Sequence, residues 1–255
     1  MLRKPANDMT KRFENKVVVV TGGTDGIGLA TAKSFAREGA HVYITGRRQA
    51  RLNEALQEIG HGAVGVQGDV SSLADLDRLY GQIQGAKGRV DVVFANAGVS
   101  ESAPIGGIEE DHFDRVFGIN AKGTVFTVQK ALPLMSAGGT VVLAGSGAGS
   151  KGFPNLSIYS ATKAAIRSLA RTWTTDLKNQ GIRVNVVSPG MVLTPAMQTY
   201  LHDNPGSEAW MQQTIPIGRL AEPDEIAKAV LFLASDESSF VGGEELFVDG
   251  GFVAV

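Results

Sequence analysis

Tyr159 and Lys163 lie four residues apart in the segment Ser157–Lys163. A helix would present the phenol and the ammonium at this spacing on one face. A phenol with an ordinary pKa of about 10 is a weak acid or base at neutral pH, and a neighbouring cation favours its phenolate. The pair could therefore exchange a proton with a substrate, although a solvated surface pair is the commoner explanation when the spacing occurs alone.

A glycine-rich loop, Thr21–Gly28, follows a run of valines near the start of the chain. Lys16–Val20 predicts a parallel strand buried on both faces, and helical periodicity runs over Leu29–Glu38. Free amides and the helix dipole would create an anion site above Gly26–Gly28, where missing side chains let a pyrophosphate approach. The loop therefore indicates dinucleotide binding rather than a plain turn.

Strand and helix patterns alternate along the chain. The expected strands are 16–20, 41–45, 63–67, 90–95, 140–144, 183–188 and 245–248. The expected helices are 27–38, 49–59, 73–86, about 109–134, 155–180 and 223–234. This alternation predicts a single α/β domain, a Rossmann-type doubly wound parallel sheet of about seven strands with helices on both faces.

We expect this catalytic domain to span 13–255 and a disordered N-terminal extension to span 1–12, with Met9 as a candidate natural start. The stretch at about 191–219 is apolar and interrupted by prolines, which predicts an irregular segment. Such a segment over a ligand site is typical of a substrate lid. The alternative is a satellite hydrophobic cluster packed on the body of the domain.

Composition limits the function classes. The 255 residues fit one large α/β domain, and Lys+Arg 24 against Asp+Glu 26 give a net charge of −2. This balance carries no electrostatic signature of nucleic-acid or anionic-membrane binding. The absence of cysteine excludes disulfides, thiolate catalysis and cysteine-ligated metals, and the four scattered histidines suggest no metal site. No apolar run is long enough to span a bilayer, and we expect a cytoplasmic protein.

The glycine spacing Gly22-x-x-x-Gly26-x-Gly28, together with Tyr159-x-x-x-Lys163, resembles the classical short-chain dehydrogenase/reductase family. The resemblance covers nearly the whole chain, because further motifs occur in the family's order: Asp69–Val70, Asn96–Gly98, Asn120, Ser146, Ser188–Gly190, Thr194 and Val248–Gly251. Ser146 precedes Tyr159 by 13 residues, the family's usual separation. The chain departs from the pattern before Asn96, where it has an alanine and many members have a second asparagine.

The resemblance implies a catalytic set of four residues, Asn120, Ser146, Tyr159 and Lys163. Tyr159 would exchange a proton with the substrate oxygen, and Lys163 would lower the pKa of Tyr159 and bind the nicotinamide ribose. Ser146 would orient the substrate oxygen, and Asn120 would hold a water in a proton relay. Taken singly, Ser146 could be turn chemistry and Asn120 a mid-helix residue bonded to the backbone.

Cofactor preference depends on the end of the second strand. Gly46 stands where NAD users carry an acidic residue, and Arg47 offers a guanidinium to a 2′-phosphate. These residues predict NADPH rather than NADH. Asp25 argues the other way, because many NADP-dependent members have a basic residue there. The expected cofactor residues are Gly22, Thr24, Asp25, Gly26, Ile27, Gly28, Arg47, Asp69, Val70, Asn96, Ala97, Gly98, Tyr159, Lys163, Pro189, Gly190, Val192 and Thr194.

We therefore expect an NADPH-dependent reductase of a small ketone or aldehyde. The alternatives are an NAD(P)-dependent secondary-alcohol, sugar or steroid dehydrogenase working oxidatively, and a dinucleotide-binding regulator without catalysis. A ketoacyl-carrier-protein reductase is disfavoured, because 136–139 and 179–180 lack the basic residues that meet an acidic carrier. The resemblance and the apolar segment 247–255 predict a homotetramer. The substrate itself is not readable from the sequence, because fold does not fix function.

Overall fold

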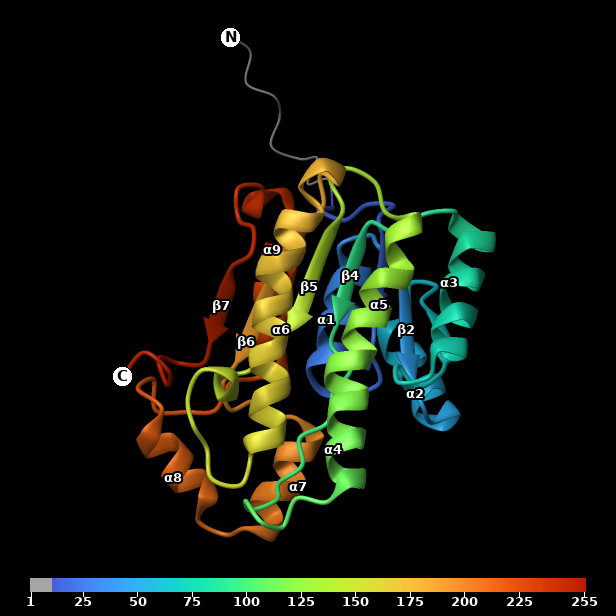
Figure 1. Cartoon of the computed structure of the whole chain (residues 1–255). Coiled ribbons are helices and arrows are strands. Elements are labelled where there is room, and N and C mark those ends of the chain that lie inside the picture. Colours follow the sequence, from blue (N-terminus) through green and yellow to red (C-terminus); the bar gives the residue numbers. More distant parts are fainter. Residues whose placement is uncertain (1–10) are drawn as a thin grey trace.

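The computed structural model describes residues 11–255 (Figure 1). The predicted extension falls mostly outside them, as does the candidate start at Met9. Its last two residues, Lys11 and Arg12, lie inside the described range. Arg12 Nη2 donates to Glu38 Oε1 at 3.0 Å. Phe13 is buried, with its ring centroid 4.8 Å from that of Phe35. Arg12 therefore contacts the domain that we expect to begin at residue 13, and the boundary itself stays a prediction.

Seven parallel strands form one sheet in the order β3-β2-β1-β4-β5-β6-β7. The strands are β1 (Val17–Val20), β2 (His41–Gly46), β3 (Val64–Gln67), β4 (Val92–Ala95), β5 (Thr140–Ala144), β6 (Arg183–Pro189) and β7 (Glu245–Val248). The strand order reverses at β1, which pairs with both β2 and β4. In such a sheet the ligand crevice lies outside the carboxyl ends of the strands at the switch point. The predicted doubly wound α/β fold is confirmed.

Helices cover both faces of this sheet (Figure 1). They are α1 (Gly26–Arg37), α2 (Gln49–Ile59), α3 (Leu73–Lys87), α4 (Glu110–Phe117), α5 (Gly123–Ala131), α6 (Ser157–Asp176), α7 (Pro195–Asp203), α8 (Ser207–Thr214) and α9 (Pro223–Ala234). Val17 and Val19 of β1 join the core beneath α3, α5 and α6, whereas Val18 and Val20 join the core beneath α1, α2 and α9. This two-sided burial explains the uninterrupted valine run.

The long helix predicted over 109–134 is divided in the structure. A π-helical turn, Gly118–Lys122, joins α4 to α5, and a 3₁₀ turn, Leu132–Leu134, follows α5. The backbone amide of Gly123 donates to the carbonyl of Gly118, five residues back, so the turn accommodates one extra residue. Such bulges frequently occur at functional sites, and this one contains Asn120.

The segment predicted to be irregular, 191–219, contains α7 and α8. Thr194 caps α7, because its Oγ1 accepts from the Met197 amide at 3.2 Å. Pro195 occupies the first turn of α7, where its missing N–H is not needed and its fixed φ favours the helix. Gly206 precedes α8 with a left-handed φ of 90°. One of the prolines that suggest an irregular segment, Pro195, is therefore the first residue of a helix.

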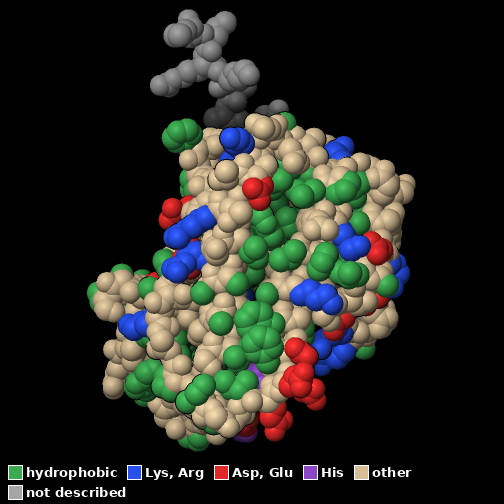
Figure 2. All heavy atoms as spheres, viewed as in Figure 1, with side chains coloured by type: hydrophobic (Ala, Val, Ile, Leu, Met, Phe, Trp, Pro, Cys, Tyr) green, Lys and Arg blue, Asp and Glu red, His purple; other side chains and the backbone are tan. Residues whose placement is uncertain are grey.

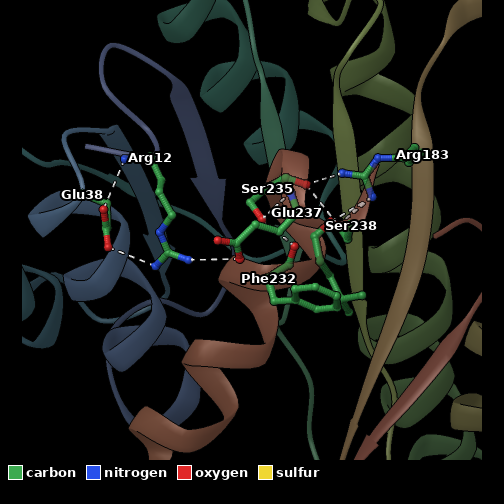
Figure 3. A network of polar contacts seen from close by, with 8 residues as sticks. Arg12, Glu38, Arg183, Phe232, Ser235, Glu237 and Ser238 are labelled. Atoms are coloured by element: carbon green, nitrogen blue, oxygen red, sulfur yellow. Dashed lines mark hydrogen bonds and ion pairs between the residues drawn. The ribbon is translucent and has the colours of Figure 1, made fainter. Parts of the chain in front are cut away.

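A half-buried arginine, Arg183, joins the amino end of β6 to the carboxyl end of α9 (Figure 3). Arg183 donates to the carbonyl oxygens of Leu233 at 3.1 Å and Ser235 at 3.0 Å, and to Ser238 Oγ at 3.0 Å. Burial lowers the pKa of Arg183 below its ordinary value. A cation at a helix C-terminus is favourable because the macrodipole is negative there. The network therefore stabilises the fold at the amino end of β6.

Among residues 11–255, no helix combines the length and the hydropathy needed to cross a membrane. No group of histidine, aspartate and glutamate side chains in the same range has the arrangement of a metal site.

Candidate active site and cofactor cleft

A cleft of about 320 Å³ opens at the carboxyl ends of the strands around the switch point. The loops after β1, β2, β3 and β4 and the start of α7 form its walls. The lining residues are Gly22, Thr24, Asp25, Gly26, Ile27, Gly28, Thr45, Gly46, Arg47, Arg48, Gly68, Asp69, Val70, Asn96, Ala97, Gly98, Val99, Ile119, Thr194 and Ala196. Segments far apart in the sequence thus meet at the place that the fold favours for a dinucleotide.

Most of the expected cofactor residues line this cleft; the others are Tyr159, Lys163, Pro189, Gly190 and Val192. Tyr159 and Lys163 lie on α6 beside it, as described below. Gly190 packs against Asp249, because a Cβ built on this glycine would lie 2.7 Å from the Asp249 Cα. Val192 is buried in the core near α9. The binding roles of the five residues stay predictions.

Several cleft residues are absent from the sequence prediction. They are Gly68, Val99, Ile119 and Ala196. Each lies one or two positions from a predicted residue. The available signal was therefore adjacency at a strand end or a helix start, where neighbouring side chains alternate between the core and the crevice.

The amino end of α1 has the character of an anion site. Asp25 occupies its N-cap position, but the carboxylate makes no capping hydrogen bond, and the first turn holds no acidic residue. The loop packs tightly on the helix: a Cβ on Gly28 would lie 2.1 Å from the Gly22 carbonyl oxygen. First-turn amides and the helix dipole therefore face the cleft and fit a pyrophosphate.

Asn96 braces the glycine-rich loop from the end of β4. Its Nδ2 donates to the carbonyl oxygens of Thr21 at 3.0 Å and Gly22 at 3.1 Å. In return, Thr21 Oγ1 accepts from the backbone amides of Asn96 at 3.0 Å and Ala97 at 3.1 Å. This reciprocal lock fixes β1 and β4 at the switch point. Thr21 belongs to the predicted glycine-rich loop, but its bracing role was not predicted, because its partners are distant in the chain.

Lys163 places a buried ammonium next to the cleft. Its side chain comes from α6, the residue is 7% exposed, and Nζ donates to the carbonyl of Ala144 at 2.7 Å. Nζ also lies 5.6 Å from the centroid of the Tyr159 ring and 3.7 Å from a Cβ built on Gly98, a cleft residue. Burial lowers the pKa of Lys163 to about 8, because a charged ammonium is poorly solvated there.

Tyr159 is half-buried one helical turn before Lys163. Burial raises the pKa of Tyr159 above its ordinary value, and a hydrogen bond with Ser146 acts in the opposite direction. The sequence predicts that Lys163 lowers this pKa; in the structure, burial is the largest cause of the shift and Ser146 is the group that opposes it. The phenol is therefore protonated at neutral pH, the form that donates a proton to a carbonyl oxygen.

Ser146 is the second residue of the loop between β5 and α6. Its Oγ accepts from the backbone amide of Ala148 at 3.2 Å, which caps a short 3₁₀ turn. The turn packs on α6, because a Cβ on Gly149 would lie 3.0 Å from the carbonyl carbon of Lys163. Ser146 thus both caps the turn and contacts Tyr159. The two contacts hold its hydroxyl beside the phenol.

Asn120 lies in the π-helical turn and is 1% exposed. Its Oδ1 accepts from the amide of Val99 at 2.8 Å, and Nδ2 donates to the Val99 carbonyl at 2.9 Å and to Thr162 Oγ1 at 3.1 Å. Both amide hydrogens are used, so the side chain links the loop after β4 to α6. The predicted role in holding a water is not carried by these contacts and stays a prediction.

Known proteins are similar to this chain over nearly its whole length. The family model described as "Enoyl-(Acyl carrier protein) reductase" matches residues 22–253. "Oxidoreductase asL5" of Sarocladium schorii is 46% identical over 96% of this chain and 98% of its own length. The "NADP-dependent (R)-specific alcohol dehydrogenase" of Lentilactobacillus kefiri is 37% identical over 96% of this chain and 100% of its own length.

A solved structure described as "short chain dehydrogenase/reductase family protein" superposes with a TM-score of 0.84 at 41% identity. The match covers 96% of this chain and 100% of that one. The chain therefore belongs to the classical short-chain dehydrogenase/reductase family and is an oxidoreductase that acts on CH–OH or C=O groups with a nicotinamide dinucleotide.

Proposed function

We propose that the protein is an NADPH-dependent reductase of small ketones or aldehydes. The observation that carries this proposal is the position of Tyr159 on α6, beside Ser146 and the buried ammonium of Lys163 at the edge of the cleft. Burial raises the pKa of Tyr159, which favours the protonated phenol at neutral pH. A bound dinucleotide supplies the hydride. Tyr159 gives its proton to the substrate oxygen, and Ser146 orients that oxygen. The nearby cation favours the phenolate that remains.

An apolar cluster near the loop 145–156, which connects β5 to α6 and is here called the catalytic loop, supports a small apolar substrate. Met211, Ile215, Leu220 and Phe252 form its buried centre. Partly buried hydrophobic residues pack against them: Phe153, Met191, Leu193, Met197, Leu201 and Val253. Many of these residues come from the segment 191–219, which we assign as the substrate lid. A lid of this composition excludes water and favours a hydrophobic carbonyl over a sugar.

An assay of purified protein tests the function. The loss of NADPH absorbance is followed with a panel of aliphatic, cyclic and aromatic ketones, and the corresponding alcohols are tested with NADP⁺. At neutral pH we expect the reduction of apolar ketones to be faster than the oxidation of the corresponding alcohols, because Tyr159 is protonated there. A protein that binds NADPH but turns over no carbonyl or alcohol would instead be a non-catalytic binding protein.

The preference for NADPH is assigned to Arg47, which lines the cleft after β2. Its side chain is 65% exposed, and Nη1 lies 4.0 Å from Asp69 Oδ2, so the guanidinium is held only loosely. We expect Arg47→Ala to lower kcat/KM for NADPH by about ten- to a hundredfold, because a charge-assisted phosphate contact is lost, and to change the value for NADH little. Arg51→Ala is the matched control, since Arg51 pairs with Glu54 on α2 outside the cleft.

Gly46 adds a steric condition to this test. A Cβ at position 46 would lie 2.3 Å from Thr24 Cγ2, so an acidic residue there needs a smaller neighbour. We expect Thr24→Ser, Gly46→Asp and Arg47→Ala together to invert the preference, because the new carboxylate accepts from the ribose diol and repels phosphate. Wild-type protein that uses NADH as well as NADPH would contradict the role of Arg47 and point to Asp25.

We further propose a homotetramer. Phe252 of the apolar segment 247–255 packs inside its own chain, so this residue is not available to a partner subunit. The support for a subunit interface comes instead from the helical surface. Figure 2 shows hydrophobic side chains gathered over the α4–α6 face, where Phe113 is 42% exposed and stacks on Phe117. Light scattering at micromolar concentration should give about four times the chain mass of 26.8 kDa. A mass near 26.8 kDa would contradict the proposal.

A further inference from the structure

The segment 249–255, here called the tail segment, folds onto the catalytic loop. In Figure 1 its red ribbon lies beside the yellow-green loop that precedes α6. The Asp249 carboxylate sets its turn, because Oδ1 accepts from the Gly251 amide at 2.9 Å and Oδ2 accepts from the Val253 amide at 2.8 Å. The tail segment is thus internally braced.

Lys151 joins the catalytic loop to the tail segment. Its Nζ donates to the carbonyl oxygens of Phe252 and Val255, each at 3.0 Å. The same ammonium lies 4.4 Å from the centroid of the Phe252 ring, within cation–π range. The Phe252 ring in turn stacks on Phe153 of the loop, with centroids 5.6 Å apart and planes inclined by 23°. One lysine therefore makes three contacts across this junction.

The junction is close to the reacting groups. Gly147, which follows Ser146, leaves room for the tail segment, because a Cβ on it would lie 3.0 Å from Val253 Cγ2. The same loop leads into α6 and Tyr159. A displacement of the tail segment would therefore open space beside the two side chains that hold the substrate oxygen.

The tail segment also contacts the lid. Phe252 is 4% exposed and belongs to the same buried cluster as Met211 on α8 and Ile215 just after it. The tail segment thus lies between the catalytic loop on one side and the lid on the other. The tail segment would therefore limit the space for a substrate that reaches Ser146 from the lid side.

We propose that Lys151 is a positioning residue, which pins the tail segment as a wall of the substrate site and thereby limits substrate size. The proposal deepens the reductase function and rests on it. Lys151 acts through the two carbonyl oxygens and the Phe252 ring, without contacting the reacting atoms. Its ammonium is committed to these contacts, so it is not assigned to binding an acidic substrate.

Two variants of Lys151 test whether its contacts hold the tail segment in place. Lys151→Met keeps the length of the side chain and removes its donors, whereas Lys151→Arg retains both donors and charge. Lys178→Met, at an exposed lysine after α6, is the matched control. Hydrogen exchange of the amides of 249–255, followed by mass spectrometry, should be about tenfold faster in Lys151→Met, because two hydrogen bonds are lost. It should stay at the wild-type rate in Lys151→Arg and in the control.

The kinetic readout separates positioning from a general structural role. In Lys151→Met we expect KM for a small ketone to rise about tenfold, with kcat within about threefold and Kd for NADPH unchanged. Relative activity on bulkier ketones should increase, since the wall gives way. Lys151→Arg should restore the small-ketone KM.

Three outcomes would overturn the proposal. Unchanged exchange in Lys151→Met would mean that Phe252 packing alone holds the tail segment. Faster exchange with an unaltered KM would mean that the tail segment is no wall of the substrate site. Loss of activity confined to ketones that carry a carboxylate would make Lys151 a substrate-binding group. Exchange needs no turnover, so wild-type protein without reductase activity but with a Lys151-dependent tail segment would refute the proposed function and support the pin.

Discussion

Tyr159→Phe should lower kcat for ketone reduction by about a hundredfold or more, because it removes the proton donor and little else. The ring that packs beside Lys163 is retained, so the Kd for NADPH should stay within about twofold of wild type. The hydroxyl of Ser146 remains to bind the substrate oxygen, and KM should therefore change less than kcat. Steady-state kinetics and a dinucleotide titration by fluorescence measure the two quantities separately.

Tyr200→Phe is the matched control for this prediction. Tyr200 lies on α7 with 47% of its surface exposed, and its hydroxyl has no role in the proposed chemistry. The control should keep wild-type kcat. Retention of more than about a tenth of kcat in Tyr159→Phe would show that another group supplies the proton.

Lys163→Met should abolish turnover, weaken NADPH binding and yet stabilise the fold at neutral pH. Burial brings the pKa of Lys163 from 10.5 to about 8, so the unfolded chain binds more protons than the folded chain between these values. The free energy of unfolding then rises with pH through this window, and at pH 7 the full cost of burying the charge is present. That cost is about 3 kcal/mol, of which the bond to Ala144 offsets about 1 kcal/mol.

Urea unfolding at two pH values measures this effect. At pH 7 the methionine variant should be more stable than wild type by about 2 kcal/mol, and at about pH 10 the advantage should largely disappear. Lys178→Met, at an exposed site, should match wild type at both pH values. A Lys163→Met protein that is less stable than wild type at pH 7 would mean that the ammonium contributes more through its contacts than its burial costs.

The sequence predicts the elements of this fold well because their signals are local. Valine-rich strands such as β1 are buried on both sides of the sheet and read as apolar runs. The sequence could not reveal that the helix over 109–134 contains a π-helical turn at Asn120, because α4 and α5 continue the same periodicity on either side. It missed α7 because Pro195 reads as a breaker unless the Thr194 cap before it is recognised.

In the candidate site, too, features with local signals could be predicted, whereas features that depend on distant residues could not. Motif spacing predicts the glycine-rich loop and the Tyr159–Lys163 pair, because both depend on residues close together in one segment. The pKa of Tyr159 could not be predicted, since burial depends on tertiary packing that the spacing of two residues does not describe. The contact between Thr24 and residue 46 and the link from Lys151 to Phe252 likewise join distant segments. Only the folded chain reveals such contacts.

The central claim is that this protein reduces a carbonyl with a hydride from NADPH and a proton from Tyr159. Its most direct test uses NADPH that carries deuterium at the transferable position of the nicotinamide, with an apolar ketone and mass spectrometry of the product. We predict an alcohol with one deuterium on the carbinol carbon from wild-type protein, and about a hundredfold less of it from Tyr159→Phe in the same time. Alcohol formed by both proteins at equal rates, or NADPH consumed without labelled alcohol, would contradict this account.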